Sequence, residues 1–276
     1  MIKRILVGLG GTPFTKVSTL CATKLAALHQ AQTTGVTVVD LAKLGKTGPV
    51  PVGGGYYAQK MRERKEQVTM EGIEQAIEAF KASCSAQQVV CRRIEYEQKD
   101  PFTAMIAEAR YNDLTIFGLR SVFDYGFVSD PDKAIIKLVT QGVRPILAVA
   151  DTYRPIKKAL IAYSGSMESA KAIRHFLHLK PWPDVTLHIV HFKESGDSEP
   201  FLLEHAADFC RAHGFEVQTD LVDGLARTDL IPFASKVDAD LIVLGNSVHK
   251  TLLKQLIGDT VLETIKSADR PLFLSQ

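Results

Sequence analysis

An internal repeat of domain length is the feature that most restricts how this chain can fold. The first copy opens at 4–12 with a basic residue, an apolar run and a turn of small residues, and the second copy opens in the same way at 158–166. Each copy also contains an apolar run that begins Asp-Leu and ends in glycine, at 113–118 and at 240–245. A repeat of this length indicates two copies of one module rather than a single irregular domain.

The two copies also end alike, which sets the predicted domain boundaries. An Arg-Pro pair followed by an apolar run occupies 144–149 and again 270–274. The polar, proline-bearing segment between the copies, 150–155, is typical of a linker. We therefore predict one domain at 1–150 and a second at 156–276.

Short apolar, β-branched runs alternate with helical segments in both copies. The strands that we predict are 3–8, 35–40, 88–95, 114–118 and 145–149 in the first copy, and 157–163, 185–191, 215–222, 240–244 and 271–275 in the second. The predicted helices include 16–29, 61–84, 101–110, 169–179 and 201–213. This alternation predicts an α/β fold class, with two tandem five-stranded parallel-sheet domains whose sheets carry helices on both faces.

The last strand of each copy is apolar and terminal. An apolar strand at the edge of a sheet has unpaired backbone groups that need covering. We therefore expect the strands near 146–149 and 272–274 to pack the two domains together as an intramolecular pseudo-dimer. A homodimer of two such tandem chains is a further candidate assembly.

Two copies that each carry Asp-Leu-x-x-x-Gly, a glycine-punctuated loop, a helix and an Arg-Pro-led strand resemble the universal stress protein family in its tandem form. The resemblance covers nearly the whole chain. It implies the fold of that family, which is of the adenine nucleotide alpha hydrolase-like type. It also implies a stress-response protein that acts by binding or scaffolding rather than by catalysis.

The nucleotide-binding motif of that family is only partly retained in the second copy. The motif is glycine, two residues, glycine, nine residues, and glycine followed by serine or threonine. Gly245 and Gly258 match its first and third glycines, whereas Val248 replaces the middle glycine and Asp259 the final hydroxyl. A β-branched valine resists the positive φ that glycine adopts, and an aspartate opposes an anion at a helix start.

Thr260 and Glu263 have the spacing of a capping box, which would use the backbone donors that a phosphate needs. We therefore expect at most weak binding of ATP or AMP by the second domain, and no cofactor that the protein requires. The resemblance implies that such a nucleotide would contact Gly245, Asn246, Ser247, Val248, Gly258, Asp259 and Thr260.

The first copy departs further from the motif. Gly118 is followed by Ser121 where the second glycine belongs and by Pro131 where the third belongs. Where nucleotide-binding members of the family have an aspartate after the first strand, this chain has Gly10 and Ser164. We expect the first domain not to bind a nucleotide.

A second hypothesis is a nucleotide-dependent enzyme, either a slow ATPase or an adenylating enzyme. Ser164, Gly165, Ser166 and, three residues on, Ser169 resemble the Ser-Gly-Gly-x-Asp-Ser loop of PP-loop ATP pyrophosphatases, which cradles a pyrophosphate. Two of the six positions differ, and small residues suit any tight turn from strand to helix, so we favour a structural turn. A third hypothesis is a sensor that binds ATP or AMP without chemistry.

Composition excludes other classes of partner. With 33 Lys and Arg against 31 Asp and Glu the net charge is +2, which argues against a nucleic-acid partner. The apolar run at 5–7 is too short for a signal segment or a membrane span, so we expect a cytoplasmic protein with no membrane partner. The four cysteines lack metal-site spacing and no third ligand accompanies His175 and His178, so we expect no metal site.

Overall fold

The computed structural model describes residues 1–10, 13–39, 54–97, 101–119, 138, 143, 145–193, 201–245, 248–251 and 254–275. The first half contains β1 (Arg4–Gly8), α1 (Pro13–His29), β2 (Gln32–Val39), α3 (Gly55–Ala86), β3 (Cys91–Glu97), α4 (Pro101–Ala109), β4 (Leu114–Gly118) and β5 (Ile146–Val149). The second half contains β6 (Lys158–Ala162), α6 (Met167–Leu179), β7 (Thr186–Lys193), α7 (Leu202–Ala212), β8 (Val217–Asp223), α8 (Ala226–Lys236), β9 (Leu241–Gly245), β10 (Val248–Thr251), β11 (Lys254–Ile257), α9 (Asp259–Ser267) and β12 (Leu272–Ser275). All ten predicted strands are present, with boundaries that differ by up to three residues.

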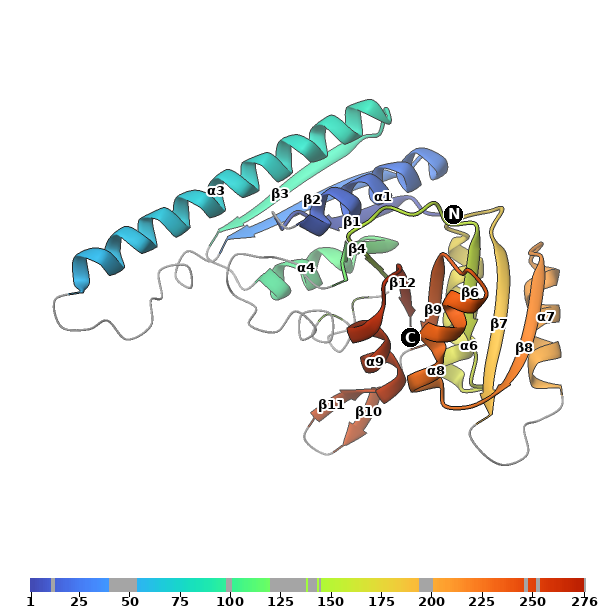
Figure 1. Cartoon of the computed structure of the whole chain (residues 1–276). Coiled ribbons are helices and arrows are strands. Elements are labelled where there is room, and N and C mark those ends of the chain that lie inside the picture. The colour runs from blue at the N-terminus through green and yellow to red at the C-terminus, as the bar shows by residue number, and fades with distance from the viewer. Residues whose placement is uncertain are drawn as a thin grey trace.

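The same strand order occurs in both halves. One sheet runs β3-β2-β1-β4-β5-β12-β9-β6-β7-β8, so β1 and β6 each have their second and third strands on one side and their fourth and fifth on the other (Figure 1). Within this sheet, the strand pairs of each half are parallel. The topology therefore repeats as the sequence does, and the fold is α/β as predicted.

The two five-stranded halves are joined edge to edge into one ten-stranded sheet. β5 and β12 pair antiparallel, with Leu147 opposite Phe273. Both strands are fully buried. Each would otherwise present unpaired backbone groups beside an apolar face, and the pairing removes both edges at once.

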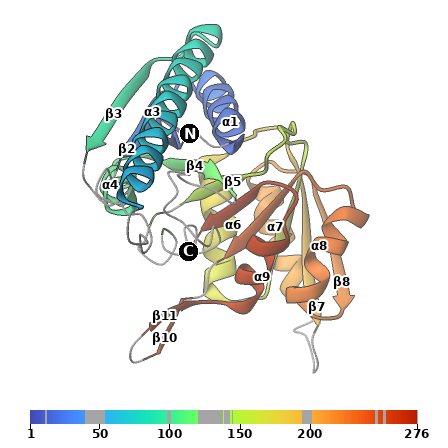
Figure 2. The ribbon, with the colours of Figure 1, turned by 60° about the vertical axis from the view of Figure 1, so that its left-hand side comes forward.

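Helices cover both faces of the sheet (Figures 1 and 2). In the first half, a Cβ placed on Gly35 of β2 would meet Phe80 of α3, whereas one on Gly8 of β1 would meet Met105 of α4. Gly8 is in register with Val36, the neighbour of Gly35, so α3 and α4 lie on opposite faces. In the second half α6 contacts α7, and α8 contacts α9.

An aspartate before the fourth strand of each half holds the start of the first strand. The Asp113 carboxylate accepts hydrogen bonds from the backbone N–H groups of residues 3 and 4 at 2.7 and 2.9 Å. The Asp240 carboxylate accepts from residues 157 and 158 at 2.9 and 3.0 Å. The repeated Asp-Leu pattern thus encodes the same contact twice, which is strong support for a duplicated module.

The repeated Arg-Pro pair also has a structural reason in the second half. Arg270 is 4% exposed, and its guanidinium donates to the carbonyls of Ala234 and Ala239, to the Ser235 hydroxyl and to the Asp269 carboxylate. Burying a charge is unfavourable unless its donors are satisfied, and these contacts use all five N–H groups. Arg270 therefore ties the end of α8 to the start of β12. Arg144, its counterpart, lies outside the described residues.

No helix among the described residues has the length and apolar character needed to cross a bilayer.

Candidate functional site

The carboxyl ends of β6 and β9 lie side by side at the place where the strand order of the second half diverges. From β6 the chain passes through α6 to β7 on one side, whereas β9 is the neighbour of β6 on the other side. Ligands of open α/β sheets bind at the carboxyl ends of strands where the strand order diverges in this way. β9 ends at this point with Gly245. β6 ends here too, and Ser164 follows it in the chain.

The glycine motif and the serine loop, which belong to separate hypotheses, meet at this place. Gly245 begins the glycine motif, and the serine loop 164–166 leads into α6. A Cβ placed on Gly245 would lie 2.5 Å from the carbonyl oxygen of Glu168 and 2.6 Å from the backbone nitrogen of Ser169. The end of β9 thus packs directly on the first turn of α6, and only glycine permits this approach. Packing within the protein therefore explains why residue 245 is glycine, and no ligand is required for this explanation.

Three serine side chains form a closed cluster at the start of α6. The hydroxyl of Ser164 is 3.0 Å from that of Ser166 and 3.3 Å from that of Ser169, and the last two are 3.3 Å apart. Ser166 is the N-cap and accepts a hydrogen bond from the backbone N–H of Ser169 at 3.2 Å. Ser169 is buried, whereas Ser164 and Ser166 are exposed. Two hydroxyls are therefore held in fixed positions and open to solvent.

Gly165 completes this turn. Its φ is +79°, in the left-handed region that favours glycine, and a Cβ there would approach the Leu202 side chain to 2.9 Å. Ser164, Gly165 and Ser166 thus each have a structural role, as the interpretation of this loop as a turn requires. The exposed hydroxyls remain free to contact a ligand as well.

Helix α9 begins differently from the prediction. Its N-cap is Gly258, with φ −61° and ψ 143°, and no described side chain caps it. Thr260 lies inside the helix, where its carbonyl accepts the Thr264 hydroxyl at 2.7 Å, so the predicted capping box is wrong. Because Gly258 adopts the extended conformation, the helix starts at Asp259 and Thr260 is too far along the chain to cap it. Asp259 is exposed in the first turn.

The segment between the two motif glycines forms a β-hairpin rather than an open loop. Val248 begins β10 and is paired with Ile257 of β11, next to Gly258. The β-branched residues Val248 and Thr251 of β10 favour a strand over the glycine-rich loop of the motif. The pairing brings the two ends of the segment together. Asn246 and Ser247 lie outside the described residues.

The first copy can be compared only in part. Gly118 ends β4, as Gly245 ends β9. Gly10 is buried after β1, at the position that Ser164 occupies in the second copy. Ser121 and Pro131 lie outside the described residues, as does the Asp130 that precedes this proline.

One polar pair, which lies next to Gly245, was not found by sequence reasoning. Ser275 is in register with Gly245 across β12 and β9, and its hydroxyl is hydrogen-bonded to Nδ1 of His175 on α6. The two residues are 100 positions apart, so no local pattern links them.

Two further histidines of the second half, His188 and His191, have structural partners. Nε2 of buried His188 donates to the Asp220 carboxylate at 2.6 Å, and Nδ1 of His191 donates to the carbonyl of Tyr163 at 2.8 Å. Within the described part of the chain, no cluster of three or more His, Cys, Asp or Glu side chains could hold a metal ion.

The geometry defines a duplicated α/β protein with a cluster of small residues at the carboxyl ends of β6 and β9 in its second half. A universal stress protein of Synechocystis sp. is 23% identical over 164 residues, which cover 58% of this chain and 56% of that protein. One of Methanocaldococcus jannaschii is 23% identical over 140 residues, which cover 43% of this chain and 81% of that protein. The chain thus spans about half the length of the first of these relatives. No family model matches the chain.

Solved structures agree with the sequence matches. A universal stress protein from Archaeoglobus fulgidus has a TM-score of 0.66 at 17% identity, covering 98% of this chain and 95% of its own. A putative universal stress protein from Pseudomonas aeruginosa has a TM-score of 0.61 at 20% identity, covering 99% of this chain and 92% of its own. Both share this fold over nearly the whole length. The chain is thus similar in sequence to universal stress proteins and shares the fold of solved members of that family.

Proposed function

We propose that this protein is a stress-response binding protein whose second half binds an adenine nucleotide weakly and without catalysis. The observation that supports this proposal is the meeting of the serine cluster and Gly245 at the carboxyl ends of β6 and β9. A fixed pair of exposed hydroxyls at a strand-order divergence is a suitable contact for phosphate or ribose oxygens.

The start of α9 adds a second set of donors. Helix N-termini attract anions through free N–H groups and the helix dipole, and no described side chain caps this one. The carboxylate of Asp259 opposes a phosphate at this place. Because a pair of like charges about 4 Å apart near a protein surface repels by about 1 to 4 kcal/mol, we expect weak binding that depends on salt.

Calorimetric titration with ATP and AMP tests the proposal. Asp259→Ser removes the opposing charge, and position 259 is the first helical residue rather than the N-cap, so we expect ATP to bind roughly five- to tenfold more tightly. Glu74→Ser is the control, because Glu74 is an exposed acidic residue of α3, in the first half of the chain. ATP affinity that is equal in the two variants would overturn the electrostatic argument.

The same samples test the absence of catalysis. We expect no ADP, AMP or pyrophosphate to accumulate during incubation with ATP. The competing hypothesis of a nucleotide-dependent enzyme predicts turnover that is lost on Ser166→Asn, a change that removes the hydroxyl and keeps an N-capping residue. Turnover in the parent protein that this variant abolishes would establish the enzyme instead.

We further propose that the protein acts in the cytoplasm as a scaffold, alone or as a homodimer of tandem chains. The family resemblance supports the stress-response role.

A further inference from the structure

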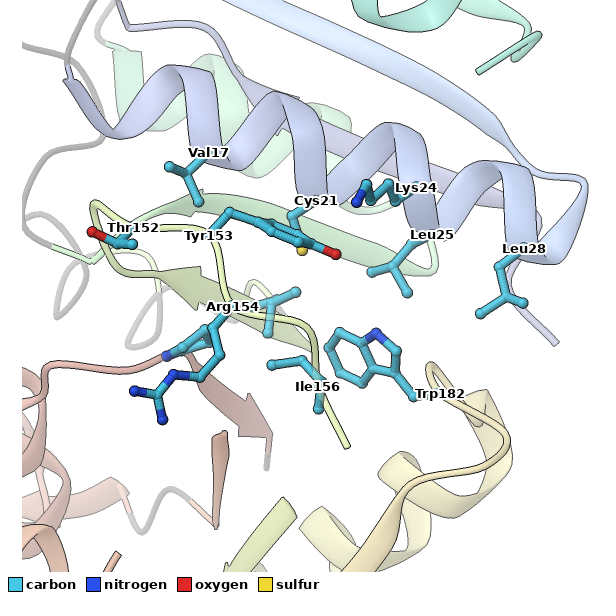
Figure 3. Close-up of a pocket in the computed structure, with 12 residues that line it drawn as sticks. Val17, Cys21, Lys24, Leu25, Leu28, Thr152, Tyr153, Arg154, Ile156 and Trp182 are labelled. Atoms are coloured by element: carbon cyan, nitrogen blue, oxygen red, sulfur yellow. The ribbon is translucent and has the colours of Figure 1, made fainter. Parts of the chain in front are cut away.

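A second region, between the two halves of the chain, is separate from the serine cluster and Gly245. A cavity of about 200 Å³ is bounded by α1, the connecting segment 152–156, Leu147 of β5, Trp182 and Pro271 (Figure 3). The segment 152–156, which overlaps the predicted linker 150–155, therefore forms one wall of a cavity.

The walls of this cavity are largely apolar. Val17, Leu25 and Leu28 project from α1, and they face Ile156 and Trp182 on the opposite side (Figure 3). A dry cavity of about 150 Å³ accepts benzene, whereas pockets for drug-sized ligands begin at about 300 Å³. A volume of about 200 Å³ therefore suits a single ring with a small substituent.

The charged side chains that line the cavity are basic. The described residues that line it include Lys24 and Arg154 but neither Asp nor Glu. The guanidinium of Arg154 is directed to groups outside the lining, 3.8 Å from the Asp240 carboxylate and 3.4 Å from the Ala239 carbonyl. The ammonium of Lys24 lies 4.4 Å from the ring centroid of Tyr153, at the cavity.

The thiol of Cys21, which also lines the cavity, adds no negative charge to it. Burial raises the pKa of Cys21 to about 12, with the nearby charge of Lys24 acting in the opposite direction. Cys21 is therefore neutral at physiological pH, and Lys24 remains the charge that faces an occupant.

From the apolar walls, the ring-sized volume and the charge of Lys24, we propose that this cavity binds a small monocarboxylate with a ring-sized apolar body. The carboxylate pairs with Lys24, and the ring packs between α1 and Trp182. A cation is disfavoured by the two basic side chains, and a nucleotide exceeds the volume. Because the occupant contacts both halves, binding stabilises their arrangement by mass action.

Benzoate is a suitable probe, and the protein supplies its own reporter. Trp182 is the single tryptophan of the chain, so its fluorescence reports on this cavity alone. We expect a saturable change on titration of the full-length protein with benzoate, with a Kd on the order of 1 mM for so small a ligand.

Substitution of Lys24 separates charge recognition from apolar burial. We expect Lys24→Gln to weaken benzoate binding roughly fivefold and to leave binding of the neutral analogue benzyl alcohol unchanged. Lys16→Gln is the matched control, because Lys16 is an exposed lysine of the same helix that does not line the cavity. Both lysines are exposed, so neither variant removes core packing.

Three results would overturn the proposal: no saturable response of Trp182 to benzoate, equal weakening by both lysine variants, or equal weakening of benzoate and benzyl alcohol by Lys24→Gln. The proposal is independent of nucleotide binding. Asp259→Ser should leave the benzoate titration unchanged, so failure of one site does not imply failure of the other.

Discussion

At the scale of single residues, Arg270 shows how a repeated sequence pattern can encode a buried polar contact. Its guanidinium satisfies carbonyls at the end of α8 and also binds the Asp269 carboxylate through two atoms, at 2.7 and 3.0 Å. Its hydrogen bonds lower the pKa of Asp269, while burial acts in the opposite direction. An arginine in such a place resembles an ordinary surface charge when only its sequence neighbours are considered.

We expect Arg270→Lys to lower the free energy of unfolding by about 2 to 4 kcal/mol, because an ammonium cannot reach the five positions that the planar guanidinium serves. Urea denaturation measures this loss. The control is Arg211→Lys: Arg211 is half exposed and lies 2.8 Å from Asp208, so its replacement should change stability by less than about 0.5 kcal/mol. Equal losses in the two variants would contradict the role given to Arg270.

The pH dependence follows from the same contact. A carboxylate with a lowered pKa in the folded state contributes stability above its unfolded pKa, here 3.8, and this stability is lost as pH falls through the folded value. Arg270→Lys should therefore make the fall in stability below about pH 4 less steep. A fall of unchanged steepness would show that Arg270 does not control the titration of Asp269.

At the scale of elements, the ten sheet strands were predicted and the hairpin was not. Strand prediction succeeded because the central strands are short apolar runs, as buried parallel strands are, although the outer strands β3 and β8 carry charged residues. The hairpin β10–β11 covers the segment expected to be a nucleotide loop, and the deciding residue is Val248. Its β-branched side chain was judged only as a poor glycine, although it is also a good strand residue.

The matched aspartates allow a test of the duplication at this scale. Asp113→Ala and Asp240→Ala each remove the acceptor of two backbone hydrogen bonds at the start of a strand. We expect each to lower the free energy of unfolding by about 1 to 2 kcal/mol, with similar values in the two variants. Thermal or urea denaturation measures both. A loss confined to one variant would show that the two contacts are not equivalent.

At the scale of the whole molecule, the two halves are held by contacts besides β5 and β12. Nε2 of buried His29 donates to the carbonyl of Pro181 at 2.9 Å, and the N-terminal ammonium donates to the carbonyl of His178 at 3.2 Å. Tyr153 and Ile156 of the connecting segment pack against the core. These contacts favour two halves that remain together as a pseudo-dimer, which stays a prediction.

Cutting the connection tests this prediction. A protease site inserted between Asp151 and Thr152, both of which are exposed, can be cleaved after the full chain has folded. We expect the two fragments to elute together in size-exclusion chromatography under native conditions, because β5 and β12 would otherwise expose fully buried strands. An uncut sample is the reference. Separation into two monomeric fragments would rule out the pseudo-dimer.

The sequence by itself determined the duplication, the α/β class and the places of the strands, because apolar runs, glycines and the repeated aspartates act over short distances along the chain. Only the tertiary structure decided that Gly245 packs beside the serine loop at the start of α6. It also decided that α9 begins at Asp259 rather than at the predicted capping box. It alone placed Lys24 and Trp182 around one cavity. These features depend on residues brought together by strand order and helix packing, and no local pattern records contacts between segments so far apart in the chain.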